Sequence, residues 1–180
     1  NGFLQTDSFS LSQTEPPDSG IPNSSFEQTD PNNSSLPQYW QTSNWGSNRS
    51  TFSYLTNGYQ STRSVRVDMK RYQSGDAKWW YEPINITPGE TYVFSNHYKS
   101  SVATRIVVWV VTSSGTNQYI GLGSASASSN WTEFHDSFTA PYNAVKATVC
   151  HVIEANGYLP VDDYQFAPGQ TQGFDRAIIT

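Results

Sequence analysis

The chain has 180 residues, a formal net charge of −5 and only 14% charged residues, while aromatic residues make up another 14%. This length allows one domain with a sizeable core, and the wealth of aromatic, Ser, Thr and Asn residues favours an all-β extracellular protein over a helical one. We see no apolar run long enough to cross a membrane and no basic cluster, so neither a membrane nor a nucleic-acid partner is expected.

The first residues resemble a later part of the chain. Residues 1–11 (NGFLQTDSFSL) align without a gap to residues 156–166 (NGYLPVDDYQF). Such an internal match indicates a repeated unit, so we predict that residues 1–11 are the closing strand of a preceding copy. The alternative is a chance similarity between two short β segments. Residues 12–20, rich in Pro, Ser and acidic residues, then form a linker.

Residues 21–167 form the predicted module. Short stretches with β-type patterns follow one another, and turn signals such as Asn57-Gly58 and Ser113-Ser114-Gly115 separate them. This spacing is typical of a β-sandwich, and we predict a jelly roll of two antiparallel sheets. The main predicted strands are residues 38–45, 64–69, 77–86, 91–99, 103–112, 131–139, 145–153 and 159–166.

The stretch 74–101 is expected to be the central hairpin of the module. Strands 77–86 and 91–99 would be joined at Pro88-Gly89, a pair that suits a tight turn. Alternation along the second strand predicts a packed face with Tyr92, Phe94 and Tyr98, and an outward face with Val93, Ser95, His97 and Lys99.

Two later strands are expected to be buried. Residues 103–112 (ATRIVVWVVT) are almost entirely apolar, which predicts a strand covered on both faces with Trp109 in the core. The run ATVCHVI places Cys150 and His151 among apolar residues, so we interpret them as core side chains rather than as a reactive thiol and a ligand.

Four motifs in the same order resemble carbohydrate-binding modules of families 4, 9, 16 and 22. The first is the opening Asn23-Ser24-Ser25-Phe26-Glu27, and the second is the Pro88-Gly89 hairpin with Ser95 and Lys99. The third and fourth are Trp131 followed by Phe138-Thr139-Ala140-Pro141, and the closing Val161-Asp162-Asp163-Tyr164-Gln165-Phe166. The resemblance implies a jelly-roll fold and a polysaccharide ligand for residues 21–167.

Residues 168–180 leave the module. APGQTQG resembles a linker, and residues 174–180 (FDRAIIT) resemble the run that precedes the catalytic motif of polysaccharide deacetylases. This implies an accessory module followed by the truncated start of a deacetylase-like domain.

A structural calcium ion is implied by the same resemblance. Glu27 matches the Glu of the opening motif, and Asp162 matches the first Asp of the closing motif. Strand alternation puts Asp162 on the core side with Tyr164 and Phe166, where a carboxylate needs a partner. Calcium accepts carboxylate and carbonyl oxygens, whereas a hydrogen-bonded carboxylate without metal is the alternative.

Sugar rings stack on aromatic side chains, and their hydroxyls are bound by carboxylates, amides and imidazoles. Parity with Ile84 and Ile86 turns Trp80 inward and leaves Trp79 outward, although a β-bulge in this run would exchange the two tryptophans. The predicted sugar-binding residues are Trp79, Tyr81, His97, Lys99, Glu133 and His135, with Trp45 as a stacking residue on a loop.

We therefore expect a secreted or cell-surface, non-catalytic module that targets an attached polysaccharide-modifying enzyme to its glycan. The carboxylates show no pairing typical of a glycosidase, and no His-rich metal motif, G-x-S-x-G elbow or phosphate loop is present. The alternatives are a small jelly-roll polysaccharide lyase or hydrolase, and a structural or adhesive spacer.

Overall fold

The computed structural model describes residues 20–169, which contain thirteen strands and no helix. The predicted repeat strand at residues 1–11 and the deacetylase-like run at 174–180 lie outside these residues. Residues 20–169 thus contain no helix that could span a membrane. The strands are β1 (Thr29–Asp30), β2 (Asn33–Pro37), β3 (Trp40–Trp45), β4 (Arg49–Leu55), β5 (Ser64–Lys70), β6 (Asp76–Tyr81), β7 (Ile84–Asn85), β8 (Thr91–Ser100), β9 (Thr104–Thr112), β10 (Asn117–Ala125), β11 (Ser128–Thr139), β12 (Ala144–Val152) and β13 (Gly157–Pro168).

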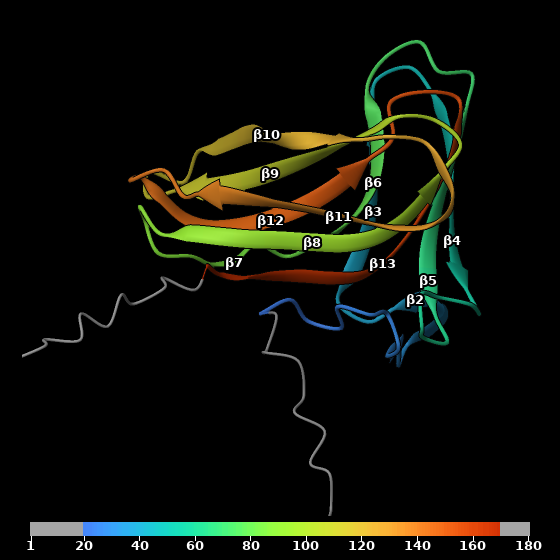
Figure 1. The fold of residues 1–180 in the computed structure, drawn as a ribbon, viewed down its shortest axis with the longest axis horizontal. Coiled ribbons are helices and arrows are strands. Elements are labelled where there is room, and N and C mark those ends of the chain that lie inside the picture. Colours follow the sequence, from blue (N-terminus) through green and yellow to red (C-terminus); the bar gives the residue numbers. More distant parts are fainter. Residues whose placement is uncertain (1–19, 170–180) are drawn as a thin grey trace, which may run out of the picture.

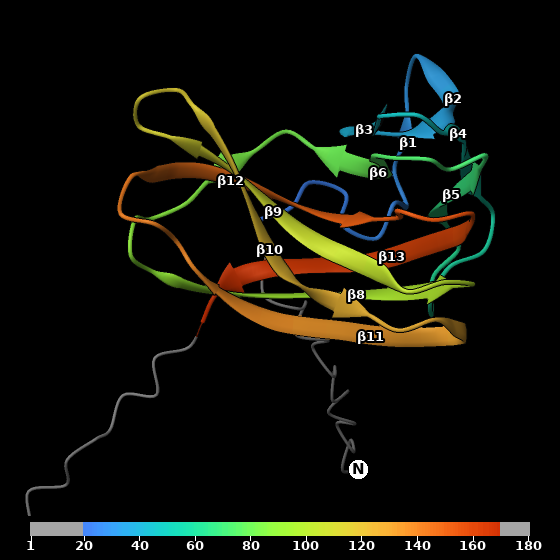
Figure 2. The same ribbon diagram turned by 90° about the horizontal axis from the view of Figure 1, so that it is seen from above.

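Eleven of the thirteen strands form two antiparallel layers, so the predicted jelly-roll sandwich is confirmed (Figure 1), and β1 and β2 form a separate two-stranded sheet. Layer A is the five-stranded sheet in the order β11-β8-β13-β5-β4. Layer B is the sheet β10-β9-β12-β7, extended by the pair β3-β6. The backbone of Ala77 in β6 exchanges two hydrogen bonds of 3.1 Å with Ile153, directly after β12, which joins the pair to this layer. Figure 2 shows the long strands of the two layers from above.

The core fills the space between the layers. Tyr92, Phe94 and Tyr98 of β8 are buried, whereas Val93, His97 and Lys99 on its other face are not, as the alternation predicts. Tyr164 of β13 is at the centre of an aromatic cluster, with ring centroids of Trp40, Phe94 and Phe26 at 5.0, 5.6 and 5.9 Å. Aromatic packing of this kind gives the sandwich much of its buried apolar area.

The stretch 74–101 is not a hairpin, and this prediction is wrong. Pro88-Gly89 does form a turn, since Glu90 N donates to Thr87 O over 3.2 Å. The strands on either side of the turn separate, however, because β7 pairs with β12 whereas β8 pairs with β11 and β13. The turn therefore connects layer B to layer A rather than two neighbouring strands.

The orientation of the tryptophan pair is also opposite to the prediction. Trp79 is 1% exposed and Tyr81 is fully buried, while Trp80 is only half-buried on the outer side. Glu82-Pro83 separates β6 from β7, and Pro cannot donate to a strand ladder. Alternation does not continue across this break, so counting back from Ile84 gave Trp79 and Tyr81 the wrong face.

Candidate functional site

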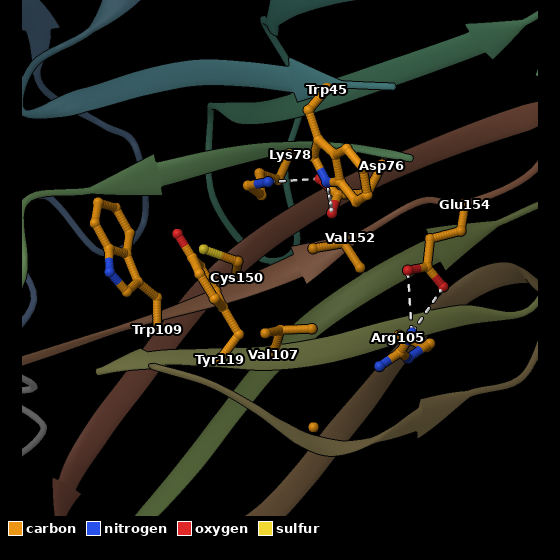
Figure 3. A pocket seen from close by; sticks show the side chains of 11 residues that line it. Trp45, Asp76, Lys78, Arg105, Val107, Trp109, Tyr119, Cys150, Val152 and Glu154 are labelled. Atoms are coloured by element: carbon orange, nitrogen blue, oxygen red, sulfur yellow. Dashed lines mark hydrogen bonds and ion pairs between the residues drawn. The ribbon is translucent and has the colours of Figure 1, made fainter. Parts of the chain in front are cut away.

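A groove with a volume of about 480 Å³ opens on the outer face of layer B (Figure 3). Strands β3, β6, β12, β9 and β10 lie side by side beneath it. Its lining combines aromatic, charged and apolar side chains: Trp45, Asp76, Lys78, Arg105, Val107, Trp109, Tyr119, Gly121, Cys150, Val152 and Glu154.

Aromatic rings line two parts of the groove. Trp45 and Tyr119 are 62% and 67% exposed, so each presents much of its ring surface. Trp109 lies almost parallel to Tyr119, with centroids 6.1 Å apart and an interplanar angle of 26°, and it also contacts Trp80 at 5.2 Å. Exposed flat apolar rings beside a cleft are suited to stack on the C–H faces of sugars.

The charged side chains of the groove are paired with one another. Asp76 accepts a 2.7 Å hydrogen bond from Trp45 Nε1 and a 2.5 Å hydrogen bond from Lys78 Nζ. Arg105 Nη1 lies 3.1 Å from the Glu154 carboxylate. The charges of the two acidic and two basic side chains cancel. The groove therefore offers polar partners for hydroxyl groups without carrying a net charge.

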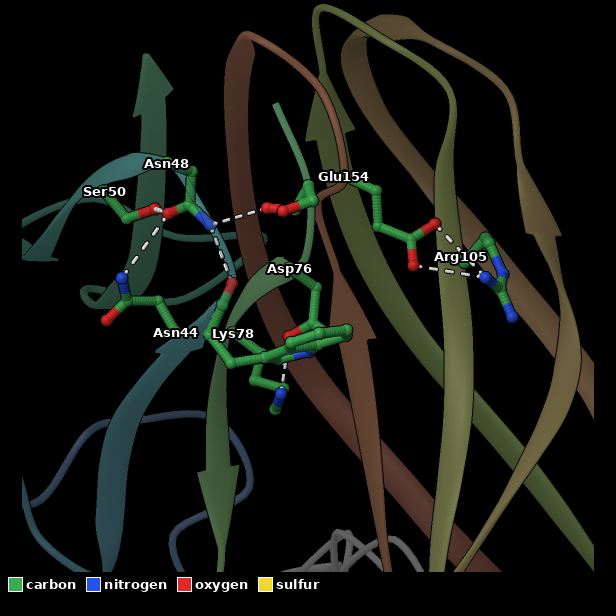
Figure 4. Close-up of polar contacts among 9 residues, drawn as sticks. Asn44, Asn48, Ser50, Asp76, Lys78, Arg105 and Glu154 are labelled. Atoms are coloured by element: carbon green, nitrogen blue, oxygen red, sulfur yellow. Dashed lines mark hydrogen bonds and ion pairs between the residues drawn. The ribbon is translucent and has the colours of Figure 1, made fainter. Parts of the chain in front are cut away.

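Two touching turns hold Trp45 at the edge of the groove. Gly46 and Gly75 both have positive φ angles, 83° and 87°, and a side chain on Gly75 would overlap the Trp45 carbonyl oxygen. Asn48 Nδ2 donates to the carbonyl oxygens of Trp45 (2.8 Å) and Ser74 (3.2 Å), which ties the turns together (Figure 4). Trp45 ends β3 rather than lying in a loop, and its role as a stacking residue stays a prediction.

The floor of the groove is apolar. Cys150 is buried on this side of β12, and burial raises the pKa of its thiol to about 12. The thiol therefore remains neutral, and the interpretation of Cys150 as a small buried hydrophobe is confirmed.

Strand β9 is not buried on both faces as predicted. Ile106, Val108 and Val110 are fully buried, whereas Arg105 is exposed and Trp109 is half-buried at the groove. The sequence did not reveal this open face, because Val107 and Trp109, which line the groove, are themselves apolar. The charged Arg105, which alternates with the apolar residues at the start of this strand, was the available signal that one face of the strand is open.

Four other predicted sugar-binding residues lie on the opposite face of the molecule, whereas Trp79 and Tyr81 are buried in the core. His97 pairs with Glu133 across β8 and β11, and Ser95 pairs with His135. These residues and Lys99 share the outer face of layer A, so the prediction correctly brings them together. It is wrong, however, to join them to Trp45, because layer A and the groove point away from each other.

This outer face of layer A carries a compact aromatic and polar patch. His97 stacks on Tyr59 with centroids 3.5 Å apart, and its Nδ1 is 3.1 Å from Asp163 Oδ2. The Lys99 ammonium lies 4.9 Å from the centroid of Trp131. His97 and Tyr59, and Lys99 and Trp131, are thus engaged with each other, whereas Trp45 and Tyr119 of the groove remain more than half exposed.

Asp162 is buried, but not on the core side that the alternation predicts. It lies opposite His97 on the outer face of layer A, because the register of β13 shifts between Asp162 and Gln165, and residues 59–61 cover it. It is fully buried, and its Oδ2 accepts hydrogen bonds from Tyr59 N (2.7 Å) and Ser61 Oγ (2.6 Å). Burial raises the pKa of this carboxyl to about 6, and these hydrogen bonds oppose the shift.

Glu27 contacts the other end of the same loop, residues 57–63. Its Oε1 accepts from Thr62 N (3.1 Å) and Arg63 N (2.7 Å), and its Oε2 accepts from the Thr62 hydroxyl. Within residues 20–169 no cluster of three or more His, Cys, Asp or Glu could hold a metal ion. The two predicted calcium ligands therefore act here as separate anchors of one loop. Calcium stays a prediction, and it would need further oxygen ligands from carbonyl groups.

His151 is a satisfied core histidine, as interpreted from the sequence. Asn96 Nδ2 donates to Nδ1 over 3.0 Å, so the proton lies on Nε2, which is 2.7 Å from Thr104 Oγ1. Burial lowers the pKa of the imidazole to about 3, which keeps it neutral.

Comparison with known proteins relates this architecture to solved structures. No protein-family model and no curated protein sequence matches the chain. The C-terminal family 22 carbohydrate-binding module of Clostridium thermocellum Xyn10B superposes with a TM-score of 0.61 at 19% identity, covering 87% of this chain and 98% of that one. The family 22 xylan-binding domain of Paenibacillus barcinonensis Xyn10C gives 0.58 at 14% identity, covering 80% and 90%.

A viral enzyme domain is also similar. The enzymatically active domain of tailspike protein 4 of bacteriophage CBA120 has a TM-score of 0.66 at 14% identity over 83% of this chain. The match spans only 21% of that tailspike chain. Identities this low establish the fold alone, and the described chain has the jelly-roll sandwich fold of family 22 carbohydrate-binding modules.

Proposed function

We propose that the groove on layer B binds a polysaccharide chain without cleaving it. The observation that carries the proposal is the joint presence of Trp45 and Tyr119, two exposed rings, with balanced polar pairs in one groove of about 480 Å³. The rings would stack on sugar faces, and Asp76, Arg105 and Glu154 would exchange hydrogen bonds with hydroxyl groups.

The ligand class follows from the absence of net charge in the groove. Neutral β-linked glycans come first, and xylan is the first choice because a similar family 22 domain is described as xylan-binding. If the deacetylase resemblance of residues 174–180 holds, acetylated forms of such polymers are the next ligands to test.

The biological role we infer is targeting. A secreted module of this kind would hold an attached polysaccharide-modifying enzyme at its insoluble substrate, which raises the local concentration even at modest affinity.

Affinity gels containing xylan or acetylated xylan test the proposal. Trp45→Ala and Tyr119→Ala should each weaken binding by about tenfold, the loss expected for one stacking contact in a cleft. Tyr142→Ala is the matched control, since Tyr142 is 92% exposed and lies outside the groove. Retained binding in both groove variants would refute the assignment.

Two rival functions give different outcomes. Release of reducing ends or unsaturated products by this chain would indicate a lyase or hydrolase. If the chain bound no glycan on an array, this result would instead support a structural spacer.

A further inference from the structure

The part of the chain that contains β4 and β5 carries a concentration of positive charge that the groove lacks. Residues 49–71 contain five of the ten Lys and Arg residues of the chain and a single acid, Asp68, which leaves a formal +4 in a protein of net −5. No run of basic residues marks this region in the sequence, but the pairing of β4 with β5 places Arg49 directly opposite Lys70.

Two of these cations face each other without a counter-ion. Arg49 and Lys70 are directly opposite across β4 and β5, and both are exposed. No ion pair within residues 20–169 involves either of them. Like charges at directly opposed positions destabilise a sheet, so their pairing needs an explanation outside the fold.

The neighbouring acid does not supply that counter-charge. Asp68 is bound by Arg66, whose Nε and Nη2 donate to its two oxygens over 2.7 and 2.5 Å. Arg66 in turn lies over the Tyr158 ring at 4.7 Å, which helps to hold the Arg66–Asp68 pair in place. The positive charge of Arg49 and Lys70 thus remains uncompensated.

A cavity of about 300 Å³ lies between these side chains, lined by Arg49, Thr51, Asp68 and Lys70. An Arg fork, an ammonium group and the Thr51 hydroxyl provide the donors that bind a carboxylate or sulfate. Because Val67 and Met69 of β5 point into the core, Arg49 and Lys70 face away from it, on the other side from the groove.

We propose that this face of β4 and β5 binds the acidic substituents of an anionic polysaccharide. The proposal shares only the polymer class with the groove assignment and does not depend on it. A nucleic acid fits less well, since phosphate-backbone binding requires many grouped cations, whereas one small pocket with two free cations suits a single acidic group.

Calorimetric titration at low and high salt tests the proposal with oligogalacturonate (carboxylate), sulfated dextran (sulfate), neutral dextran and a single-stranded oligonucleotide. The wild type should bind one of the two acidic glycans, and whether that glycan carries carboxylate or sulfate identifies the acidic group that the site recognises. Arg49→Gln and Lys70→Gln should each weaken that binding by about tenfold, as expected for a lost charge-assisted hydrogen bond.

Lys146→Gln is the control, because it removes the same charge from an exposed position on β12. Equal losses in Lys146→Gln and Lys70→Gln, tighter binding of the oligonucleotide, or no binding of either acidic glycan would overturn the proposal. The Arg49 and Lys70 variants should retain xylan binding, and Trp45→Ala should retain acidic-glycan binding. Either binding site can therefore be refuted without refuting the other.

Discussion

Trp45 and Trp79 illustrate how differently two tryptophans contribute to this protein. Trp45 is 62% exposed and gives its Nε1 hydrogen to Asp76, whereas Trp79 is 1% exposed, packs on Phe52 at 5.9 Å and donates to Arg66 O. The first side chain is available to a ligand, and the second stabilises the contact between β6 and layer A.

Substitution separates these two roles. Trp79→Ala should lower the free energy of unfolding by about 3–5 kcal/mol, the cost of removing a large buried ring. Trp45→Ala should change it by less than about 1 kcal/mol, because only an exposed ring and one hydrogen bond are lost. Urea unfolding measures both values, and a stable Trp79→Ala protein that has lost only glycan binding would favour the orientation predicted from sequence.

His151 is expected to make the stability of the protein sensitive to acid. The pKa of its folded form is about 3, below the ordinary value of 6.5, so the unfolded chain takes up the proton first. The stability contribution is complete above pH 6.5 and is lost as the pH falls toward 3. Between pH 6.5 and about 4.5 the titration of this single group should lower the free energy of unfolding by about 2 kcal/mol.

The variant His151→Gln removes this proton uptake. Its unfolding free energy should fall less steeply with acid than that of the wild type, whereas the exposed His135→Gln should follow the wild type. Parallel pH profiles for all three proteins would show that His151 is not the titrating group.

At the scale of elements, the turns that contain Gly46 and Gly75 control the shape of the groove beside them. Gly75 and Gly115 have similar φ angles, 87° and 78°, but a side chain on Gly115 would meet nothing within 4 Å. Gly115→Ala should therefore show only the backbone penalty of about 1–2 kcal/mol. Gly75→Ala should lose more stability and also weaken xylan binding, since its side chain displaces Trp45. If Gly75→Ala and Gly115→Ala lost the same stability and the same affinity for xylan, this role of the turn would be contradicted.

The loop of residues 57–63 is the element to test for calcium. EDTA should lower the melting temperature of the wild type by several degrees if a native-state ion stabilises this loop. Asp162→Asn should remove the response to EDTA while retaining the hydrogen bonds that its oxygen accepts. An unchanged melting temperature would leave Glu27 and Asp162 as loop anchors without metal.

Local patterns predicted individual strands well and their partners poorly. The faces of β8 follow from alternation alone, because its ten residues run without interruption. The Trp79 orientation failed where Pro83 breaks the strand, and the 74–101 hairpin failed because a tight turn does not specify whether its flanking strands pair. Pairing depends on contacts between distant residues, such as Ala77 with Ile153, that leave no local signal.

At the scale of the whole molecule, the two layers separate two surfaces. Sequence patterns singled out Trp45, which lies at the groove, and four residues of the outer face of layer A: His97, Lys99, Glu133 and His135. They could not show that the two surfaces face opposite ways. The neutral aromatic groove and the basic face of β4 and β5 likewise became visible only once the strands were paired.

An NMR titration of the labelled protein with xylohexaose tests the groove assignment most directly, because it locates the ligand on one face. We expect shifts of the Trp45 indole N–H and of amides around Arg105, Tyr119 and Glu154, with little change around His97 and Glu133. Shifts confined to β8 and β11 would place the sugar on layer A and contradict the groove assignment.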